Sequence, residues 1–559
     1  MDGACHGREP RADLRTLPAQ GGDPRRQRRG PHDLGSGTGV DHRQGAAPRH
    51  RRLHAVRGLD GPRPALDDAG PRSGDAELIG RARAEARLRP LPCARRPAAA
   101  ARRECSLSDY LGQLAAHAAA IRLDALPASA ITATKLVLLD TLGAIVAGSR
   151  LDENVRLARL ASARARHGAA TLLGHGSRSD AFWAALTNAT AGVALEVDEG
   201  NRLGGGHPAI HVVPGALAVA EERGLDGRRL LESVVAGYEV CSRIGGATTV
   251  RPNVHSHGTW GAIGTAVAVA RLGDAAATTI REVINLAASM SPANTWTPAL
   301  EGATIRNLYP GRSAWNGLLA AELHACGFTS LPDAPSDVYG TILADTYDPE
   351  LAIVGLDTVG HGERFRIEQN YFKLHACCRY NHFALDAIAT LRRGHHLAAT
   401  DVASVDVTTI PFGARMADPA PATMLAAKFS IPYAVAASLV LGRSDTTAFE
   451  PTALADPRIR DLARRVTVRT DASMSPRSLD QPTARVRIAL RDGRMLEAGT
   501  TVARGDAAAP VGDDEIVDKF LALTSPVLGD RRAREAVVAV RAADTVKDVR
   551  ELTAILTTA

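Results

Sequence analysis

The sequence predicts a mainly α-helical protein that carries a smaller α+β domain between two helical parts. Ala-rich segments with apolar residues at helical spacing recur through residues 106–368. Through residues 369–512 the pattern changes to short, alternating, β-branched runs, which are typical of strands. Residues 513–559 are helical again. We expect this tail to complete the first domain, so that one large all-helical domain is built from both ends.

Residues 1–105 are predicted to form a disordered segment. They hold 22 Arg, no Lys and 13 acidic residues, with no apolar periodicity, so burial cannot offset the entropy of ordering them. A start codon assigned too early would also explain such a segment. The alternatives are a basic arm for nucleic acid and a transit peptide, and its many acidic residues argue against a transit peptide.

Charge and cysteine usage narrow the function classes. Beyond residue 105 the chain has 45 basic and 48 acidic residues, so we expect no nucleic-acid partner for the folded part. The seven Cys are scattered and match neither a secreted disulfide framework nor an iron–sulfur set. No run reaches the length of apolar residues that a membrane span needs, and no signal peptide is evident. A cytoplasmic location without membrane contact is expected.

Residues typical of helix ends indicate where the helices of the first part begin and stop. Ser106 and Asp109 are good N-caps for the first helix, Gly148 suits the end of the second, and Pro208 suits a helix start. Further periodic segments cover residues 181–197, 214–223, 230–245, 261–272, 282–290 and 313–328.

The strands of the second part are expected at four places. These are residues 401–411, 464–471, 484–493 and 494–505. Asp492-Gly493 lies between the last two runs and predicts a hairpin.

Four clusters of polar residues interrupt the apolar sequence. The first contains three carboxylates, a glycine run and two histidines between helices: Glu196, Asp198, Glu199, Asn201, His207 and His211. A solvated loop explains it most simply. Because His207 and His211 are four residues apart near carboxylates, a metal site is the sharper alternative, although the spacing reveals no third ligand.

The other three clusters supply imidazoles and cations. His255 and His257 precede an apolar helix, and imidazoles suit proton transfer near neutral pH. Arg306 and Tyr309 lie before a Pro-Gly helix start, which suits an anion. Lys373, one of five Lys in an Arg-rich chain, lies near Cys377–Cys378. Each cluster also has a simpler explanation. His255 and His257 could be buried core histidines, Arg306 and Tyr309 could belong to a plain helix cap, and the position of Lys373 could be due to chance.

Seven ordered segments carry a resemblance to a known family. They are KLVLLDTLGAIVAGSR, NATAGVALEVDEG with GHPAIHVVPGALAVAEERG, GYEVCSRIG, HSHGTWGAIGTAVAVARL, RNLYPGRSAWNGLLAAELHACGF, YFKLHACCRYNHFALDA and FSIPYAVAASLVLG. Over about residues 106–559 the chain resembles the MmgE/PrpD family, which includes 2-methylcitrate dehydratase and cis-aconitate decarboxylase. The resemblance implies an α+β lid over the helical domain, a homodimer, and catalysis without metal or organic cofactor.

The resemblance also assigns roles to positions. The family's acidic loop falls on residues 196–199, its histidines on His207 and His255, and its basic residues on Arg306 and Lys373. The chain departs from the pattern at Val193, Glu196, Gly200, His257 and Arg306, where His, Asp, Thr, a small or hydroxyl residue and Lys are usual, and has one extra residue before His207.

The expected function is a lyase, a hydro-lyase by analogy, acting on a small di- or tricarboxylic acid such as a 2-methylcitrate-like substrate. His255, His207, Lys373, Glu196 and Asp198 would be catalytic. The predicted substrate-binding residues are Arg306, His257, Glu199, Asn201 and Tyr309. His255→Ala and Lys373→Ala are expected to abolish turnover while the fold stays intact.

Several alternatives remain open from the sequence. The same carbanion chemistry supports an epimerase, an isomerase or a decarboxylase. A metal-dependent hydrolase using His207, His211 and a carboxylate is another possibility, and so is an inactive binding protein that retains the fold.

Overall fold

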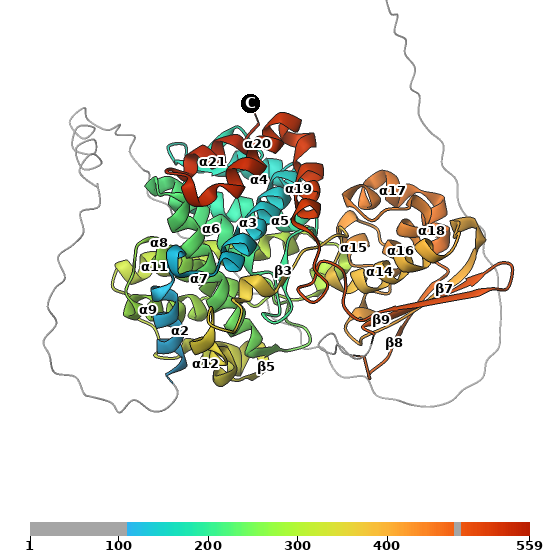
Figure 1. The fold of residues 1–559 in the computed structure, drawn as a ribbon, viewed down its shortest axis with the longest axis horizontal. Coiled ribbons are helices and arrows are strands. Elements are labelled where there is room, and N and C mark those ends of the chain that lie inside the picture. The colour runs from blue at the N-terminus through green and yellow to red at the C-terminus, as the bar shows by residue number, and fades with distance from the viewer. Residues whose placement is uncertain (1–108, 475–481, 559) are drawn as a thin grey trace, which may run out of the picture. The chain divides into compact units, whose positions relative to one another are not determined.

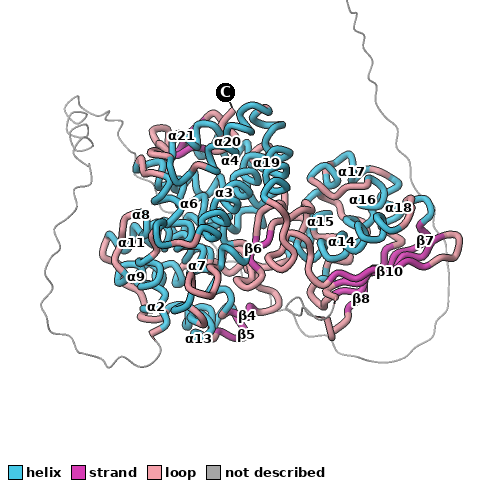
Figure 2. Tube along the Cα trace, in the orientation of Figure 1, coloured by secondary structure: helices cyan, strands magenta, loops and turns pink. Residues whose placement is uncertain are grey.

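The computed structural model describes residues 109–474 and 482–558. The segment predicted to be disordered, residues 1–105, lies outside the described residues. The described chain is mainly helical with a small mixed sheet (Figure 1). Figure 2 shows that the longer strands gather in one place while helices make up most of the remainder.

One hydrophobic core joins the early helices to the C-terminal ones. The early helices are α2 (Tyr110–Ala120), α3 (Ala128–Gly148), α4 (Asp152–Arg164), α5 (Ala181–Ala194), α6 (Pro208–Arg223), α7 (Gly227–Gly246), α8 (Gly261–Leu272), α9 (Ala277–Ser289), α11 (Leu308–Ala325), α12 (Ala334–Val338) and α13 (Pro349–Ile353). The short helix α10 (Thr297–Glu301) instead buries Ala299 in the second core. The C-terminal ones are α19 (Asp513–Leu528), α20 (Asp530–Arg541) and α21 (Val549–Ile555). Helix α19 packs on α3 and α21 packs on α6 (Figure 1), so both ends of the described chain share this core.

Helix boundaries agree with the capping chemistry in the sequence. The Asp109 carboxylate accepts the Gly112 N–H at the start of α2, and Pro208 occupies the first turn of α6. Gly148 is the last residue of α3, as predicted. A glycine is needed there for packing, since a Cβ would lie 1.9 Å from the Ala191 carbonyl oxygen.

Helix α3 corrects the expectation that no segment is long and apolar enough to span a membrane. By length and composition α3 meets that test, and 67% of its most apolar window is buried inside the protein. It packs against α5 and α19, and its buried Asp140 pairs with Lys519 of α19 at 2.5 Å. These contacts are those of a central core helix.

The prediction that the first part contains only helices was wrong in detail. Three short antiparallel pairs involve this part, and only β6 lies beyond it: β1 (Ala170–Leu172) pairs with β2 (Ser177–Ser179), β3 (Gly200–Asn201) with β6 (Asn370–Tyr371), and β4 (Thr248–Val250) with β5 (Ala344–Tyr347) in the described residues. Strands of two to four residues are too short to show the two-residue period on which sequence recognition depends.

The second core lies under a four-stranded sheet with the order β10-β9-β7-β8. The strands are β7 (Val402–Thr409), β8 (Val466–Thr470), β9 (Ala484–Leu490) and β10 (Met495–Thr500); the accompanying helices are α14 (Arg379–Gly394), α15 (Met424–Lys428), α16 (Ile431–Leu441), α17 (Pro451–Ala455) and α18 (Pro457–Ala463). The β7–β8 pair is parallel and the others are antiparallel. Along β9, buried Val486 and Ile488 alternate with exposed Arg485 and Arg487, so one face packs on α14 and the other faces solvent. The predicted β9–β10 hairpin is confirmed.

The β3–β6 pair matters most for function. It connects the loop after α5 with the segment that enters the second core, because Gly200 lies opposite Tyr371 in the register. This short pair brings together residues that are about 170 positions apart in the sequence.

Candidate active site

All four polar clusters meet at one cavity of about 300 Å³. Of the predicted residues, those that line it are Glu196, Asn201, His207, His255, His257 and Arg306. Asp198 and Lys373 lie directly behind this lining, because both contact it and are almost completely buried. The loop after α5, the segment before α8, the short 3₁₀ helix η2 (Thr304–Asn307) and the segment after β6 each contribute one cluster.

Glu196, Asp198, Lys373 and Arg306 form a buried ion network. Lys373 Nζ lies 2.9 Å from Glu196 Oε2 and 3.2 Å from Asp198 Oδ1, while Arg306 Nη1 lies 2.5 Å from Glu196 Oε1. The four side chains are at most 2% exposed. Two cations therefore face two carboxylates in a place with little solvent, where unpaired charges would be very costly.

The network keeps its members ionised. Burial alone would raise the pKa of Asp198, but Lys373, His207 and Arg306 outweigh it and hold that pKa well below its usual range. Burial opposes ionisation of Glu196 as well, and Arg306 and Lys373 still lower its pKa. Burial would lower the pKa of Lys373, yet the two carboxylates raise it. At neutral pH the network thus carries two positive and two negative charges.

The backbone at Glu196 is strained. Its φ of 56° lies in the left-handed region that side chains other than glycine rarely adopt. The preceding carbonyl, of Leu195, accepts a 2.9 Å hydrogen bond from Lys428 Nζ, which also donates to the Ala376 carbonyl at 2.9 Å. Lys428 is fully buried, and burial lowers its pKa to about 8. It ties the loop of Glu196 to the second core.

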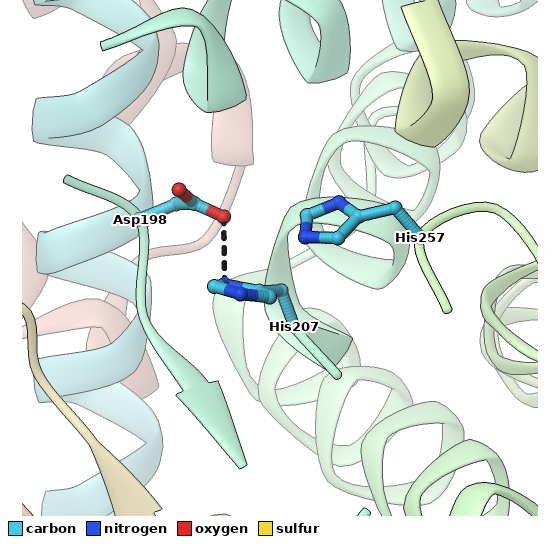
Figure 3. A group of neighbouring side chains, drawn as sticks. All are labelled: Asp198, His207 and His257. Atoms are coloured by element: carbon cyan, nitrogen blue, oxygen red, sulfur yellow. Dashed lines mark ion pairs between the residues drawn. The ribbon is translucent and has the colours of Figure 1, made fainter. Parts of the chain in front are cut away.

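His207 has the geometry of a proton acceptor at Nε2. Its Nδ1 donates to the Glu199 carbonyl at 2.6 Å and lies 3.0 Å from Asp198 Oδ2 (Figure 3). Both neighbours are acceptors, so Nδ1 carries a proton, and the lone pair of an unprotonated Nε2 lies 3.5 Å from the Tyr371 hydroxyl. Asp198 also provides a negative charge that would stabilise the imidazolium once Nε2 accepts a proton.

His255 has the opposite tautomer. Its Nδ1 accepts the His257 backbone N–H at 3.0 Å, so the ring proton is on Nε2. That Nε2 is buried and has no partner within the described residues. Burial, followed by Arg306 and the neighbouring histidines, lowers its pKa well below the usual value, so the ring is neutral. Stacking on Trp296, with ring centroids 3.7 Å apart, fixes its plane.

His257 lies between the two other histidines. Its ring centroid is 4.4 Å from that of His207 and 4.9 Å from that of His255, and neither of its nitrogens has a partner among the described residues. Burial lowers its pKa well below the usual value, so it is neutral. The Nε of Arg306 likewise has no hydrogen-bond acceptor in the described chain, whereas its Nη1 pairs with Glu196.

The structure changes the metal alternative considered from the sequence. His211 donates from Nδ1 to the His207 carbonyl and accepts the Gly258 N–H at Nε2, so both nitrogens are occupied. The group within metal-binding reach is instead Asp198, His207 and His257, whose nearest ligand atoms lie within 4.8 Å of one another (Figure 3). Lys373 close to Asp198 and Arg306 nearby make this a poor place for a cation.

Two predicted substrate-binding residues lie away from the cavity lining. Glu199 Oε1 accepts the Ala209 N–H at 2.7 Å in the first turn of α6, and its Oε2 accepts from Tyr238 Oη at 3.2 Å. Tyr309 donates to the Thr295 carbonyl at 3.2 Å. Asn201 lines the cavity, but its amide already bonds to the Gly204 N–H and the Arg366 carbonyl. These contacts are structural.

The lining also contains polar residues that were not predicted as site residues, among them Arg202, Tyr371, Arg379 and Asp506. The Tyr371 hydroxyl lies 3.5 Å from His207 Nε2, and burial raises its pKa well above the usual value, so it stays protonated. Gly200 makes room for it, since a Cβ there would lie 2.4 Å from the Tyr371 hydroxyl. Asp506 lies on a segment whose sequence carried no signal of function.

Comparison with known proteins identifies the family of this chain. Residues 112–347 match the MmgE/PrpD N-terminal domain, and residues 375–545 match the MmgE/PrpD C-terminal domain. A cis-aconitate decarboxylase of Aspergillus terreus is 23% identical over 485 residues, covering 80% of this chain and 96% of the relative. The cis-aconitate decarboxylase-like protein oryM of Aspergillus oryzae is 23% identical over 464 residues, covering 77% and 94%. The chain belongs to the MmgE/PrpD family.

Proposed function

We propose that this protein is a cofactor-independent hydro-lyase that eliminates water from a small di- or tricarboxylic acid. One observation carries the proposal: His207 and His255 have complementary tautomers at one cavity, with a lone pair on one Nε2 and a proton on the other. Elimination needs a base for the carbon-bound proton and a donor for the oxygen that gains charge.

A substrate carboxylate fits the unpartnered donors beside these histidines. The Nε group of Arg306 and the Nε2–H of His255 are buried without acceptors in the described chain, and a carboxylate would satisfy them. When the neighbouring carbon loses its proton, charge moves onto this carboxylate. Donors that are already in place stabilise such charge without reorganising.

The proposed reaction conserves every proton. His207 Nε2 takes the proton from the carbon beside the bound carboxylate, and the electron pair moves onto that carboxylate. The pair then returns to form the C=C bond as the C–O bond breaks, and protonated His207 gives its proton to the leaving hydroxyl, which departs as water. Asp198 stabilises the transient imidazolium, while neutral His255 remains a hydrogen-bond donor throughout.

Decarboxylation is the second candidate, because the relatives named above are cis-aconitate decarboxylases or resemble them. Loss of CO₂ needs no base, so a base supported by its own carboxylate favours proton abstraction. Epimerisation would need a second base on the opposite face of the carbon, and unpartnered His257 is the group that could serve.

Proton NMR of the chelator-treated protein in D₂O tests the proposal, with citrate-like, malate-like, aconitate-like and amino-dicarboxylate substrates. We expect new vinyl signals from a hydroxy acid, and their loss in His207→Gln. Disappearance of aconitate-like vinyl signals with release of CO₂ would establish decarboxylation instead. Deuterium exchange without elimination would establish an epimerase. Binding without any reaction would identify an inactive binding protein.

A further inference from the structure

Tyr371 lines the cavity directly beside the proposed base. Its hydroxyl lies 3.5 Å from His207 Nε2, the atom that takes the proton from carbon in the proposed reaction. The side chain is only 6% exposed. A role for this hydroxyl in the reaction rests on the proposed function and extends it.

The leaving hydroxyl needs a proton that His207 is poorly placed to deliver by itself. Elimination takes the proton from one carbon and the hydroxyl from the next, so Nε2 points at the first carbon when it becomes protonated. The ring is not free to swing toward the second carbon, because its Nδ1 donates to the Glu199 carbonyl at 2.6 Å and lies 3.0 Å from Asp198 Oδ2. A group that already contacts Nε2 is placed to carry the proton across this gap.

The Tyr371 hydroxyl is held at this position before any substrate binds. Tyr371 lies opposite Gly200 in the β3–β6 pair, and a Cβ at Gly200 would lie 2.4 Å from the hydroxyl oxygen. The Arg379 guanidinium carbon lies 4.3 Å from the centre of the Tyr371 ring, a cation–π contact that restrains the ring.

The contact between Tyr371 and His207 can reverse its direction during the reaction. While Nε2 is unprotonated, the tyrosine O–H donates to its lone pair, and at 3.5 Å this hydrogen bond is weak enough for a substrate C–H to displace. Once Nε2 has taken the proton from carbon, Nε2–H is the donor and the tyrosine oxygen is the acceptor. The tyrosine O–H then becomes free to donate into the cavity.

The surroundings of Tyr371 favour a relay over simple donation of its proton. Burial raises the pKa of the hydroxyl well above its usual value, and the neighbouring Arg379 offsets this only in part. A buried tyrosine that lost its proton would be left as a costly anion. If protonated His207 replaces that proton in the same step, the tyrosine stays neutral.

We propose that Tyr371 relays the proton from His207 to the leaving hydroxyl. As the C–O bond breaks, its electron pair stays on the departing oxygen, which takes the proton of the tyrosine hydroxyl. The tyrosine oxygen takes the Nε2 proton of His207 at the same time. Water leaves, both side chains regain their starting protonation states, and no proton is gained or lost.

Tyr371→Phe tests the relay, because it removes the hydroxyl and keeps the ring. Proton NMR in D₂O, with the hydroxy acid that the wild type dehydrates, measures two rates on the full chain. Exchange of the carbon-bound proton for deuterium reports the base, and the growth of vinyl signals reports elimination. We expect elimination to fall about 100- to 1,000-fold while exchange falls less than about tenfold, so that the ratio of exchange to elimination rises.

Tyr433→Phe is the matched control. Tyr433 is also buried, but its hydroxyl donates to the Ala448 carbonyl at 2.9 Å in the second core and is not part of the lining. It should keep the wild-type ratio of exchange to elimination. If Tyr371→Phe does not fold, Gly200→Ala replaces it, since the added Cβ would displace the Tyr371 hydroxyl from His207; the same rise of the ratio is expected.

An equal loss of exchange and elimination, or wild-type rates of both, would overturn the relay while leaving the proposed reaction standing. A wild-type protein that eliminates water from none of the hydroxy acids would overturn the proposed function together with the relay.

Discussion

Replacing Lys373 with Met removes the cation that lies between two buried carboxylates. Lys373 Nζ is 2.9 Å from Glu196 and 3.2 Å from Asp198, and the side chain has no exposure. Met has a similar length, so the charge is removed with little change of volume. Removing one member of a buried ion pair costs about 3–5 kcal/mol, because the partner charge stays buried. The expectation from sequence that Lys373→Ala leaves the fold intact is therefore replaced by a substantial loss of stability.

The loss of stability in Lys373→Met should depend on pH in one direction. In the wild type the pKa values of Glu196 and Asp198 are lowered, so their contribution to stability is present above the carboxylates' ordinary pKa and is lost as the pH falls. Without Lys373 we expect both pKa values to rise, so that protonation relieves the variant at low pH. The loss of unfolding free energy should be largest near pH 8 and should shrink toward pH 5.

Urea unfolding at several pH values, followed by circular dichroism, measures this difference. Lys135→Met is the control, because Lys135 pairs with Asp544 at 2.6 Å on a partly exposed surface, where the side chains are 19% and 34% exposed. There we expect a loss of about 0.2–1 kcal/mol. A Lys373→Met protein as stable as the control at pH 8, or a difference that grows toward pH 5, would refute the reasoning.

Three further predictions concern the chemistry. In steady-state kinetics Gly200→Ala should lower kcat/KM by about 100-fold, because its Cβ would displace the Tyr371 hydroxyl from beside His207. The control Gly206→Ala, whose Cβ would meet its nearest neighbour at 3.6 Å, should remain close to wild type. Asp198→Asn should lower kcat by roughly 100-fold with a smaller change in KM, since it removes the charge that stabilises protonated His207; an unchanged kcat would contradict the role of His207 as the base. Dialysis against a chelator should leave turnover unchanged, and activity that disappears and returns with zinc would favour a metal at Asp198 and His207.

The sequence indicated most of the residues that gather at the cavity, because polar residues in an apolar helical chain are conspicuous. Glu196, His207, His255, Arg306 and Lys373 lie in separate segments, yet they meet at one cavity or directly behind it. Helices and the four longer strands were also recognisable, since apolar periodicity and Asp-Gly turns are local signals. The strand pairs of two to four residues lack such signals.

The protonation states could not be predicted, because they depend on contacts that have no local sequence signal. The tautomer of His207 follows from the Glu199 carbonyl, and that of His255 follows from the His257 backbone N–H. For the same reason Glu199 looked like a substrate ligand, whereas its carboxylate caps α6. Arg379 was hidden because arginine is abundant in this chain.

The departures from the family pattern are easier to interpret in contacting pairs than one by one. Glu196 stands where Asp is usual and Arg306 stands where Lys is usual, and these two side chains lie 2.5 Å apart. Gly200 lacks the hydroxyl of the usual Thr, and the space that its missing Cβ leaves holds the Tyr371 hydroxyl, 3.5 Å from His207. The Glu196–Arg306 pair and the Tyr371 hydroxyl beside His207 are contacts that the proposed elimination would use, and for this reason we prefer an active enzyme to an inactive binding protein.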